Sequence, residues 1–300
     1  ALLDIGEGML LSGADVSLVE ARLRDMGRAC GAQSDNVFAL SSLIVASYTL
    51  PDGTVLSENR RVARSATTDF DKLKQLYELS EDFIKRPLPY EELEYRFARI
   101  EKRPFPRAML YGGSMLSTAC FAVFFGGTLI DAVVAALFSV VVCWMMEYIK
   151  PHVTNNNVFS FLAAFVSGMG IVLLARLLAM VGLHISVAMT IVGVIMILIP
   201  GVALTNAARD MISGDVITGV VDFIEVMISA TALAFGYIAA LWLLSAGMVG
   251  TPTTIQPHIV LQFAMALLSS LGFAIVFNMH KRAIPATALG GLLTWIVYSC

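Results

Sequence analysis

The sequence predicts a multi-pass α-helical membrane protein with an N-terminal cytoplasmic α+β domain. Of its 300 residues, 57% are hydrophobic and 14% are charged, whereas soluble globular proteins carry about 25% charged residues. The charge is also uneven, because residues 1–107 hold 15 of the 20 Lys and Arg residues and 17 of the 23 Asp and Glu residues. We therefore expect a soluble domain over residues 1–107 and a membrane domain after it.

The first 107 residues combine strand and helix patterns. Turn chemistry at Pro51-Asp52-Gly53-Thr54 separates two segments rich in β-forming residues, 37–50 and 55–62, which predicts a β-hairpin. Apolar periodicity, capping residues and breakers predict helices over residues 2–11, from Asp15 to Cys30, from Thr68 or Asp69 to Lys85, and over 90–101. Together these elements make the domain α+β.

From residue 108 onward the chain consists of apolar runs, each close to the length of about 20 residues that crosses a bilayer core. The fourth run is short, and Pro200-Gly201 at its end suggests a broken helix. The seventh run is cut off at residue 300 and the chain does not begin with Met, so we expect sequence to be missing at both ends. The predicted spans are 108–125, 129–149, 158–181, 185–199, 216–244 and 259–277, with the seventh starting near residue 284.

Loop charges predict the orientation of these spans. Every second loop carries Lys or Arg, and the loops between them, 126–128, 182–184 and 245–257, carry neither. By the positive-inside rule, the N-terminal domain and the basic loops lie in the cytoplasm. The basic residues are Lys102, Arg103 and Arg107, then Lys150, then Arg209, then Lys281 and Arg282.

A polar stripe runs along the predicted fifth span. At 100° per residue its five side chains fall within an arc of about 80° on an otherwise apolar helix. An ionisable group facing lipid costs about 3 kcal/mol or more near the membrane centre, so the stripe is expected to face protein or water, as a solute or ion pathway would. Its members are Asp215, Thr218, Asp222, Glu225 and Ser229.

Glu225 is the strongest candidate proton carrier in this stripe. If the span starts at Val216, Glu225 lies about 14 Å deep at 1.5 Å per residue, with Asp222 one turn earlier on the same face. If the span starts nearer Phe223, both acids simply reach cytoplasmic water. The sequence leaves both readings open.

The break at Pro200 and Gly201 suggests a substrate site. A short polar turn is expected after it, and a helix break can present backbone groups to a substrate, as in transporters with discontinuous helices. Arg209 suits a substrate carboxylate because its planar fork binds two oxygens; alternatively it sets the topology and pairs with Asp210. The other polar residue of this turn is Asn206.

The remaining signals are weaker. Arg176 in the third span either belongs to the pathway or reaches the outer interface with its long side chain. The four cysteines lack metal or disulfide spacing, and no ATP-binding, nucleophile-elbow or zinc-protease motif is present, so we expect no metal, no cofactor and no enzyme activity. Net charge is near neutral in both parts, which gives no indication of a nucleic-acid partner.

Two motifs resemble those of the bacterial threonine/serine exporter family, which also includes proteins that pair with a small second subunit and are linked to succinate export. The resemblance covers residues 1–245, and residues 259–300 look like the start of a fused small-subunit module. The implied domains are 1–107, 108–245 and 257–300. The motifs are Leu11-Ser-Gly-Ala-Asp15 with Val19-Glu20, and Leu198-Ile-Pro-Gly-Val-Ala-Leu-Thr-Asn-Ala-Ala-Arg-Asp210 with Ser213-Gly-Asp215 and Thr218-Gly219.

The resemblance implies a secondary exporter of threonine and serine in the bacterial inner membrane, driven by the proton gradient. Protons, the lipid bilayer and a small metabolite are then the partners, self-association is possible, and about ten spans are implied. One alternative is export of a small dicarboxylate such as succinate. A second is a cytoplasmic metabolite-binding or catalytic domain with a membrane anchor, although seven spans exceed what an anchor needs.

Overall fold

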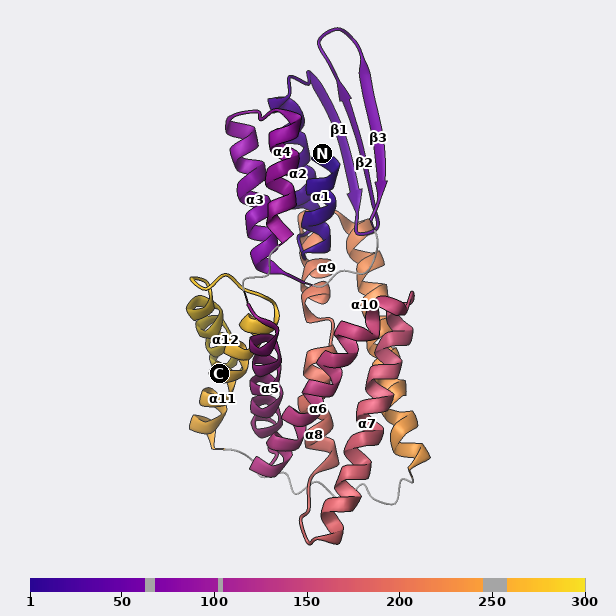
Figure 1. Ribbon diagram of the computed structural model, residues 1–300, viewed down its shortest axis with the longest axis vertical. Coiled ribbons are helices and arrows are strands. Elements are labelled where there is room, and N and C mark those ends of the chain that lie inside the picture. Colours follow the sequence, from indigo (N-terminus) through magenta and orange to yellow (C-terminus); the bar gives the residue numbers. More distant parts are fainter. Residues whose placement is uncertain (63–67, 102–104, 245–257, 300) are drawn as a thin grey trace. The chain divides into compact units, whose positions relative to one another are not determined.

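The structure, a computed structural model, describes residues 1–62, 68–101, 105–244 and 258–299 and is mostly helical (Figure 1). The chain forms two compact units. Unit 1 comprises Ala1–Pro104 and Gly201–Val226, and unit 2 comprises Phe105–Pro200 and Met227–Cys300. A segment from the middle of the predicted membrane domain therefore groups with the N-terminal domain.

Unit 1 contains a three-stranded antiparallel sheet in the order β1-β2-β3. Its strands are β1 (Ser34–Leu40), β2 (Leu43–Thr49) and β3 (Val55–Arg61). The predicted hairpin at Pro51-Asp52-Gly53-Thr54 is present between β2 and β3. The prediction of one strand over residues 37–50 is wrong, because the chain reverses between Leu40 and Leu43 and the two halves pair with each other.

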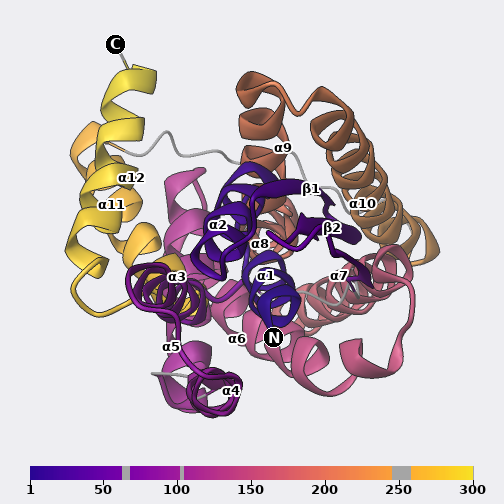
Figure 2. The ribbon, with the colours of Figure 1, turned by 90° about the horizontal axis from the view of Figure 1, so that it is seen from above.

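Helices pack against one face of this sheet (Figure 2). Asp15 caps α2 and Asp69 caps α3 by accepting hydrogen bonds from backbone N–H groups, as the sequence predicted. The apolar faces meet in a core that includes Ile5, Leu23 and Leu76, all at most 1% exposed. The helices are α1 (Leu2–Leu11), α2 (Val16–Ala29), α3 (Phe70–Lys85) and α4 (Tyr90–Ala98), which is followed by the short helix η1 (Arg99–Glu101).

Unit 2 is a helical bundle. Within the described residues, four helices are long and apolar enough to cross a membrane, namely α6, α7, α10 and α11, and α8 with α9 counts as a fifth if they form one broken span. The elements are α5 (Arg107–Phe124), α6 (Leu129–Tyr148), η2 (Lys150–His152), α7 (Asn156–Met180), α8 (Val187–Leu198), the later part of α10 (Val216–Leu243), α11 (Ile259–Val276) and α12 (Ile284–Ser299).

Two of the seven predicted spans are helices but are not among these candidates. The shorter is α12. The other is α5, whose hydropathy is lowered by Arg107 and by Ser114, Ser117 and Thr118. These three hydroxyl side chains are fully buried, so they face protein. The structure thus supports four or five of the predicted spans.

The predicted short polar turn after Pro200-Gly201 is wrong. The chain does break there, since α8 ends at Leu198, but it continues as the 13-residue helix α9 (Gly201–Ser213). Pro200 lacks the N–H that would continue α8, whereas a proline next to a helix start is well tolerated. The Ala, Leu and Arg residues that follow favour a helix. Helix α9 belongs to unit 1, where it packs on α2.

Candidate functional site

Three polar contacts within unit 1 join the start of α2 to α9 and the α9–α10 turn. We call this set of contacts the α2–α9 seam. It brings together two parts of the sequence about 190 residues apart, which are the same two parts that carry the sequence motifs. Asn206 Nδ2 donates to the Gly13 carbonyl at 3.1 Å, Arg209 pairs with Asp15, and Ser17 Oγ donates to Asp215 Oδ2 at 2.7 Å.

Asp15 serves both the helix and the seam. The chain leaves α1 through Gly13, whose φ of +101° is a conformation that suits glycine. Asp15 Oδ1 then accepts a hydrogen bond from Leu18 N at 2.7 Å as the N-cap of α2, while Oδ2 pairs with Arg209. The side chain is 9% exposed, so this nearly buried carboxylate is stabilised by a backbone N–H on one oxygen and a guanidinium on the other.

Asp210 lies beside the seam and is more deeply buried than any other acid on α9 or α10. It is 1% exposed, and its Oδ1 has no hydrogen-bond partner among the described residues. Burial raises the pKa of Asp210 from 3.8 to about 6, and the nearby carboxylates add to this effect. These carboxylates belong to Asp15, Asp222 and Asp215. Asp210 therefore takes up a proton more readily than an exposed aspartate does.

Two glycines allow α9 and α10 to form a tight pair. Gly214 takes a φ of +100° in the turn between them. A Cβ on Gly219 would lie 2.7 Å from the Ala207 carbonyl and 2.8 Å from Met211 N, which is too close for any side chain. This packing places Thr218, which is 3% exposed, and Asp215 close to the seam.

The polar stripe predicted on α10 is turned away from the exposed surface of the helix. Thr218 and Ser229 are buried, and Asp215, Asp222 and Glu225 are partly buried. Apart from the buried Val226, the apolar side chains between them are 40–73% exposed, which is the arrangement of a helix with a lipid-facing side. These exposed residues are Val216, Ile217, Val220, Val221, Phe223, Ile224, Met227 and Ile228.

Ser229 marks a contact along α10 within unit 2. Its Oγ donates to Asn157 Oδ1 at 2.7 Å, and Asn157 is the second residue of α7. Ser229 is thirteen positions after Val216, so about 20 Å of α10 precedes this contact at 1.5 Å per residue. The helix is 28 residues long, or about 42 Å, which exceeds the hydrocarbon thickness of about 30 Å.

The other predicted site residues lie apart from the seam. In unit 2, Arg176 donates to the carbonyl of Leu244, just past the end of α10. Carbonyls at a helix C-terminus lack helical partners, so Arg176 stabilises this end. Pro200 sits in the break before α9, and Gly201 is the exposed first residue of α9. The predicted alternative that Arg209 pairs with Asp210 is wrong, since its partner is Asp15.

Sequence reasoning missed several of the polar contacts. Asp15 was assigned only as a cap and a motif residue, and Ser17 carried no signal because its partner is distant in sequence. Asp131 was also missed. It is fully buried in unit 2, forms a capping box with Thr128, and accepts a hydrogen bond from Ser186 N at 2.7 Å. The Thr-x-x-Asp spacing could have identified the capping box, but not the contact with Ser186.

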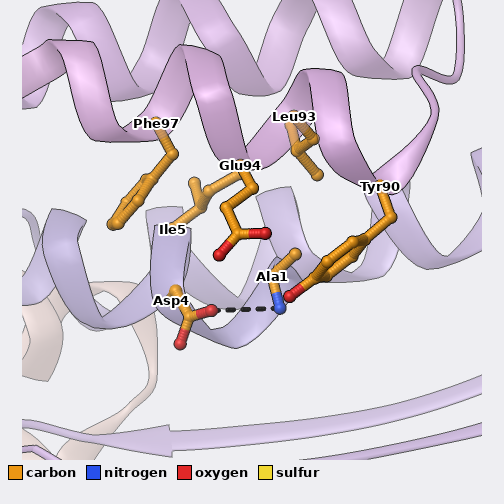
Figure 3. Close-up of a pocket in the computed structure, with 7 residues that line it drawn as sticks. All are labelled: Ala1, Asp4, Ile5, Tyr90, Leu93, Glu94 and Phe97. Atoms are coloured by element: carbon orange, nitrogen blue, oxygen red, sulfur yellow. Dashed lines mark ion pairs between the residues drawn. The ribbon is translucent and has the colours of Figure 1, made fainter.

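Unit 1 has a small pocket between α1 and α4 (Figure 3). Its volume of about 130 Å³ is well below the 300 Å³ or so at which small-molecule sites begin. Glu94 and Asp4 point into it, and Asp4 pairs with the amine of Ala1. Across the described ranges, no group of three or more His, Cys, Asp or Glu side chains is arranged to hold a metal. The seam and α10 are therefore better candidates than this pocket.

The apolar helices and the inward polar face of α10 define the class: a multi-pass membrane protein with polar groups inside its helical bundle. The chain belongs to the ThrE family, whose model, described as "Putative threonine/serine exporter", matches residues 1–244. The resemblance inferred from the two motifs is thus confirmed for this region. The family is one of transporters, which places this chain among membrane transport proteins that act on small molecules.

Two curated relatives are similar over most of their length. A protein of Klebsiella aerogenes named "Probable succinate transporter subunit YjjP" is 27% identical over 238 residues, covering 78% of this chain and 88% of the relative. Its namesake in Escherichia coli K12 is 25% identical over 243 residues, covering 78% and 89%. No solved structure matches the chain.

Proposed function

We propose that this chain is a secondary exporter that uses the proton gradient to move a small hydrophilic metabolite out of the cytoplasm. Family membership supports transport. The observation that carries the proposal is the polar face of α10, where Thr218 and Ser229 are buried while their apolar neighbours are exposed. The acids of this face lie towards the cytoplasmic end of α10 and Ser229 lies further along it, and a pathway for solute and protons accounts for a polar face that is kept away from lipid.

We place the spans in a bacterial inner membrane, with the N-terminal α+β domain in the cytoplasm. The support is the charge of the loops, because the basic residues fall at alternate loops. In this orientation the α2–α9 seam is on the cytoplasmic side, at the entrance to the pathway along α10. Residues 1–107 and 108–245 then act as the soluble and the transmembrane domain.

The length of α10 supports a position of its acids near the cytoplasmic end of the pathway. Trp242 is 76% exposed at the far end, where an aromatic side chain suits the membrane interface. Glu225 lies 18 residues before Leu243, or about 27 Å along the helix, which is close to the full hydrocarbon thickness. We therefore adopt the shallower of the two readings, in which Glu225 and Asp222 exchange protons at the cytoplasmic mouth.

Charge favours an amino acid such as threonine or serine as the substrate. Between residues 201 and 243 the chain has four acids and one base, and the base, Arg209, is paired with Asp15. A zwitterion is neutral overall and brings an ammonium group that a carboxylate can bind. Succinate carries two negative charges at neutral pH and would be repelled by the acids.

The second candidate substrate is a small dicarboxylate. It is favoured by the names of the two relatives, each a probable succinate transporter subunit. For this chain to bind succinate, Arg209 would have to release Asp15 and accept a substrate carboxylate. The two candidates thus differ in whether the Arg209–Asp15 pair must open.

We also propose that residues 257–300 act as a small-subunit-like module. The support is their packing, since α11 lies directly on α5 through glycine (Figure 1). A Cβ on Gly272 would lie 2.6 Å from the Gly113 carbonyl, a close approach typical of paired membrane helices. The relatives are named subunits, which supports a multi-part transporter, formed with a partner chain or by self-association.

Efflux from proteoliposomes tests the proposal. Vesicles holding the full-length chain would be loaded with labelled threonine, serine or succinate, with and without a pH gradient. We expect gradient-dependent efflux of threonine or serine, lost in Glu225→Gln. The control is Glu78→Gln, an exposed acid on α3 that is 60% exposed in a surface ion pair with Lys74. Efflux of succinate alone would favour the dicarboxylate, and full gradient-dependent efflux in Glu225→Gln would remove the proton role of Glu225.

A further inference from the structure

The α2–α9 seam contains one group whose charge is not balanced locally. Asp210 is 1% exposed, and its Oδ1 has no hydrogen-bond donor among the described residues. The guanidinium of Arg209 is next to it in sequence but pairs with Asp15. A buried carboxylate with one oxygen that lacks any donor is expensive, whereas a protonated carboxyl group in the same place is not.

The charged groups around Asp210 come from each element packed at the seam. The start of α2 contributes Asp15, α9 contributes Arg209, the α9–α10 turn contributes Asp215 and α10 contributes Asp222. Among the described residues, the cation found at this group is Arg209, and its ion pair is with Asp15. Only a backbone hydrogen bond from Val16 favours the ionised form of Asp210. This is also where the N-terminal domain holds the connection that leads into α10.

We infer that Asp210 binds a proton when the α2–α9 seam is closed and releases it when the seam opens. The seam is then a proton-controlled contact between the N-terminal domain and the α9–α10 hairpin. This inference rests on the proposed proton-driven export, to which it adds a second proton site besides Glu225. It assigns the N-terminal domain a role, which is to open or close the cytoplasmic end of α10 according to the charge on Asp210.

The direction of the pH effect follows from linkage. The closed seam holds the pKa of Asp210 at about 6, while the open seam would return it towards 3.8. The closed state therefore binds the proton more tightly and is favoured as the pH falls. Between pH 7.5 and pH 5 the ratio of closed to open molecules should rise about tenfold, with little further change above pH 7.5.

Distance measurements between spin labels test the inference without depending on transport. Labels would be placed on Cys introduced at Ala21 on α2 and Ser213 on α9, both exposed, in the full-length chain with its native cysteines replaced. In lipid nanodiscs, electron–electron distance distributions at pH 5 and pH 7.5 should show a short, closed population that grows about tenfold relative to the open one at low pH.

Two variants assign the effect to Asp210. Asp210→Asn mimics the protonated group, so the seam should be closed at both pH values. If that variant does not fold, Asp222→Asn removes a neighbouring carboxylate and should move the transition to lower pH while Asp210 is intact. Glu78→Gln, which removes an exposed acid on α3, is the control and should keep the wild-type response.

A distance distribution that does not change with pH, or a pH response that persists in Asp210→Asn or is unmoved in Asp222→Asn, would overturn the inference. Efflux in the same preparations separates this failure from failure of the proposed function. Gradient-driven efflux with a pH-insensitive seam would leave export standing and remove the role of Asp210. A pH-sensitive seam without gradient-driven efflux would do the reverse.

Discussion

Two helix contacts in this molecule are held together by opposite means. In unit 1, the α2–α9 seam is held by polar groups: an ion pair, a hydrogen bond between two side chains and a hydrogen bond from a side chain to the Gly13 carbonyl. In unit 2, α5 meets α11 through backbone, because Gly113 and Gly272 leave no room for a Cβ between the helices. The first contact depends on charge and the second on volume.

The difference indicates which contact can open. Close glycine packing gives many small van der Waals contacts and is lost only when the helices separate. An ion pair with an exposed Arg, 64% exposed at Arg209, contributes little net stability in water and responds to salt and pH. We therefore expect the α5–α11 contact to be permanent and the α2–α9 seam to be the adjustable one.

The largest effect is expected from filling the glycine contact. Gly113→Leu would place a side chain 2.8 Å from Ile275 and 3.0 Å from the Gly272 carbonyl at its Cβ alone, and overpacking of this kind costs about 3 kcal/mol. The matched control is Gly112→Leu, because a Cβ there meets nothing within 4 Å. Thermal unfolding in detergent should show a large drop in melting temperature for Gly113→Leu only. Equal drops in the two variants would contradict the assigned contact between α5 and α11.

The next effect concerns the α9–α10 hairpin. Gly219→Leu would push against the Ala207 carbonyl and Met211 N, with an expected cost of about 2 kcal/mol because part of the strain falls on the flexible Met211 side chain. The neighbouring Val220→Leu, on the exposed side, is the control. Hydrogen exchange of α9 should accelerate in the first variant, and unchanged protection would show that the helices do not meet as described.

Substitution of Asp15 should separate its two roles. Asp15→Ala removes both the N-cap of α2 and the partner of Arg209, and should destabilise unit 1 by about 1 to 2 kcal/mol. Asp15→Asn keeps a good cap but loses the charge, so it should cost about 1 kcal/mol or less. Urea unfolding of the two variants provides the comparison. Equal decreases in the free energy of unfolding would mean that the N-cap makes no measurable contribution to the stability of unit 1.

The smallest effect is that of ionic strength. Raising the salt concentration from about 0.05 M to 1 M shortens the Debye length from more than 10 Å to about 3 Å and should weaken the seam by about 0.5 kcal/mol. The α5–α11 contact has no charged pair among its described contacts and should not respond. Amide hydrogen exchange should become faster with salt in the first turn of α2 and stay unchanged in α11. Equal acceleration in both helices would show that the two contacts do not differ in their dependence on charge.

Local rules predicted most elements correctly because their signals are local. The caps Asp15 and Asp69, the hairpin turn and the apolar runs each lie within a few residues of the structure they specify. The errors arose where local signals conflict. Residues 37–50 form two strands, yet the turn at Ser41 and Ser42 carries neither Gly nor Pro. Helix α9 begins at Gly201, within a Pro-Gly pair that usually indicates a turn.

The candidate site was predicted only in part. Helical periodicity identified the polar face of α10, because those residues share one helix. The partners of Asn206, Arg209 and Asp215 could not be found in this way, since they lie near Asp15, about 190 residues earlier. Contacts between distant segments depend on tertiary packing, which leaves no periodic trace in the sequence. The role of Asp210 follows from that packing.

Asp131 has a consequence for how the chain inserts into a bilayer. Its carboxylate accepts hydrogen bonds from the backbone N–H groups of Thr128 and Ser186, the N-cap residues of α6 and α8, so the positive ends of two helix dipoles meet at one acid. This fully buried acid therefore has a counter-charge that comes from peptide groups. No Lys or Arg is needed at that end of the bundle, and the charge asymmetry that guides membrane insertion is preserved.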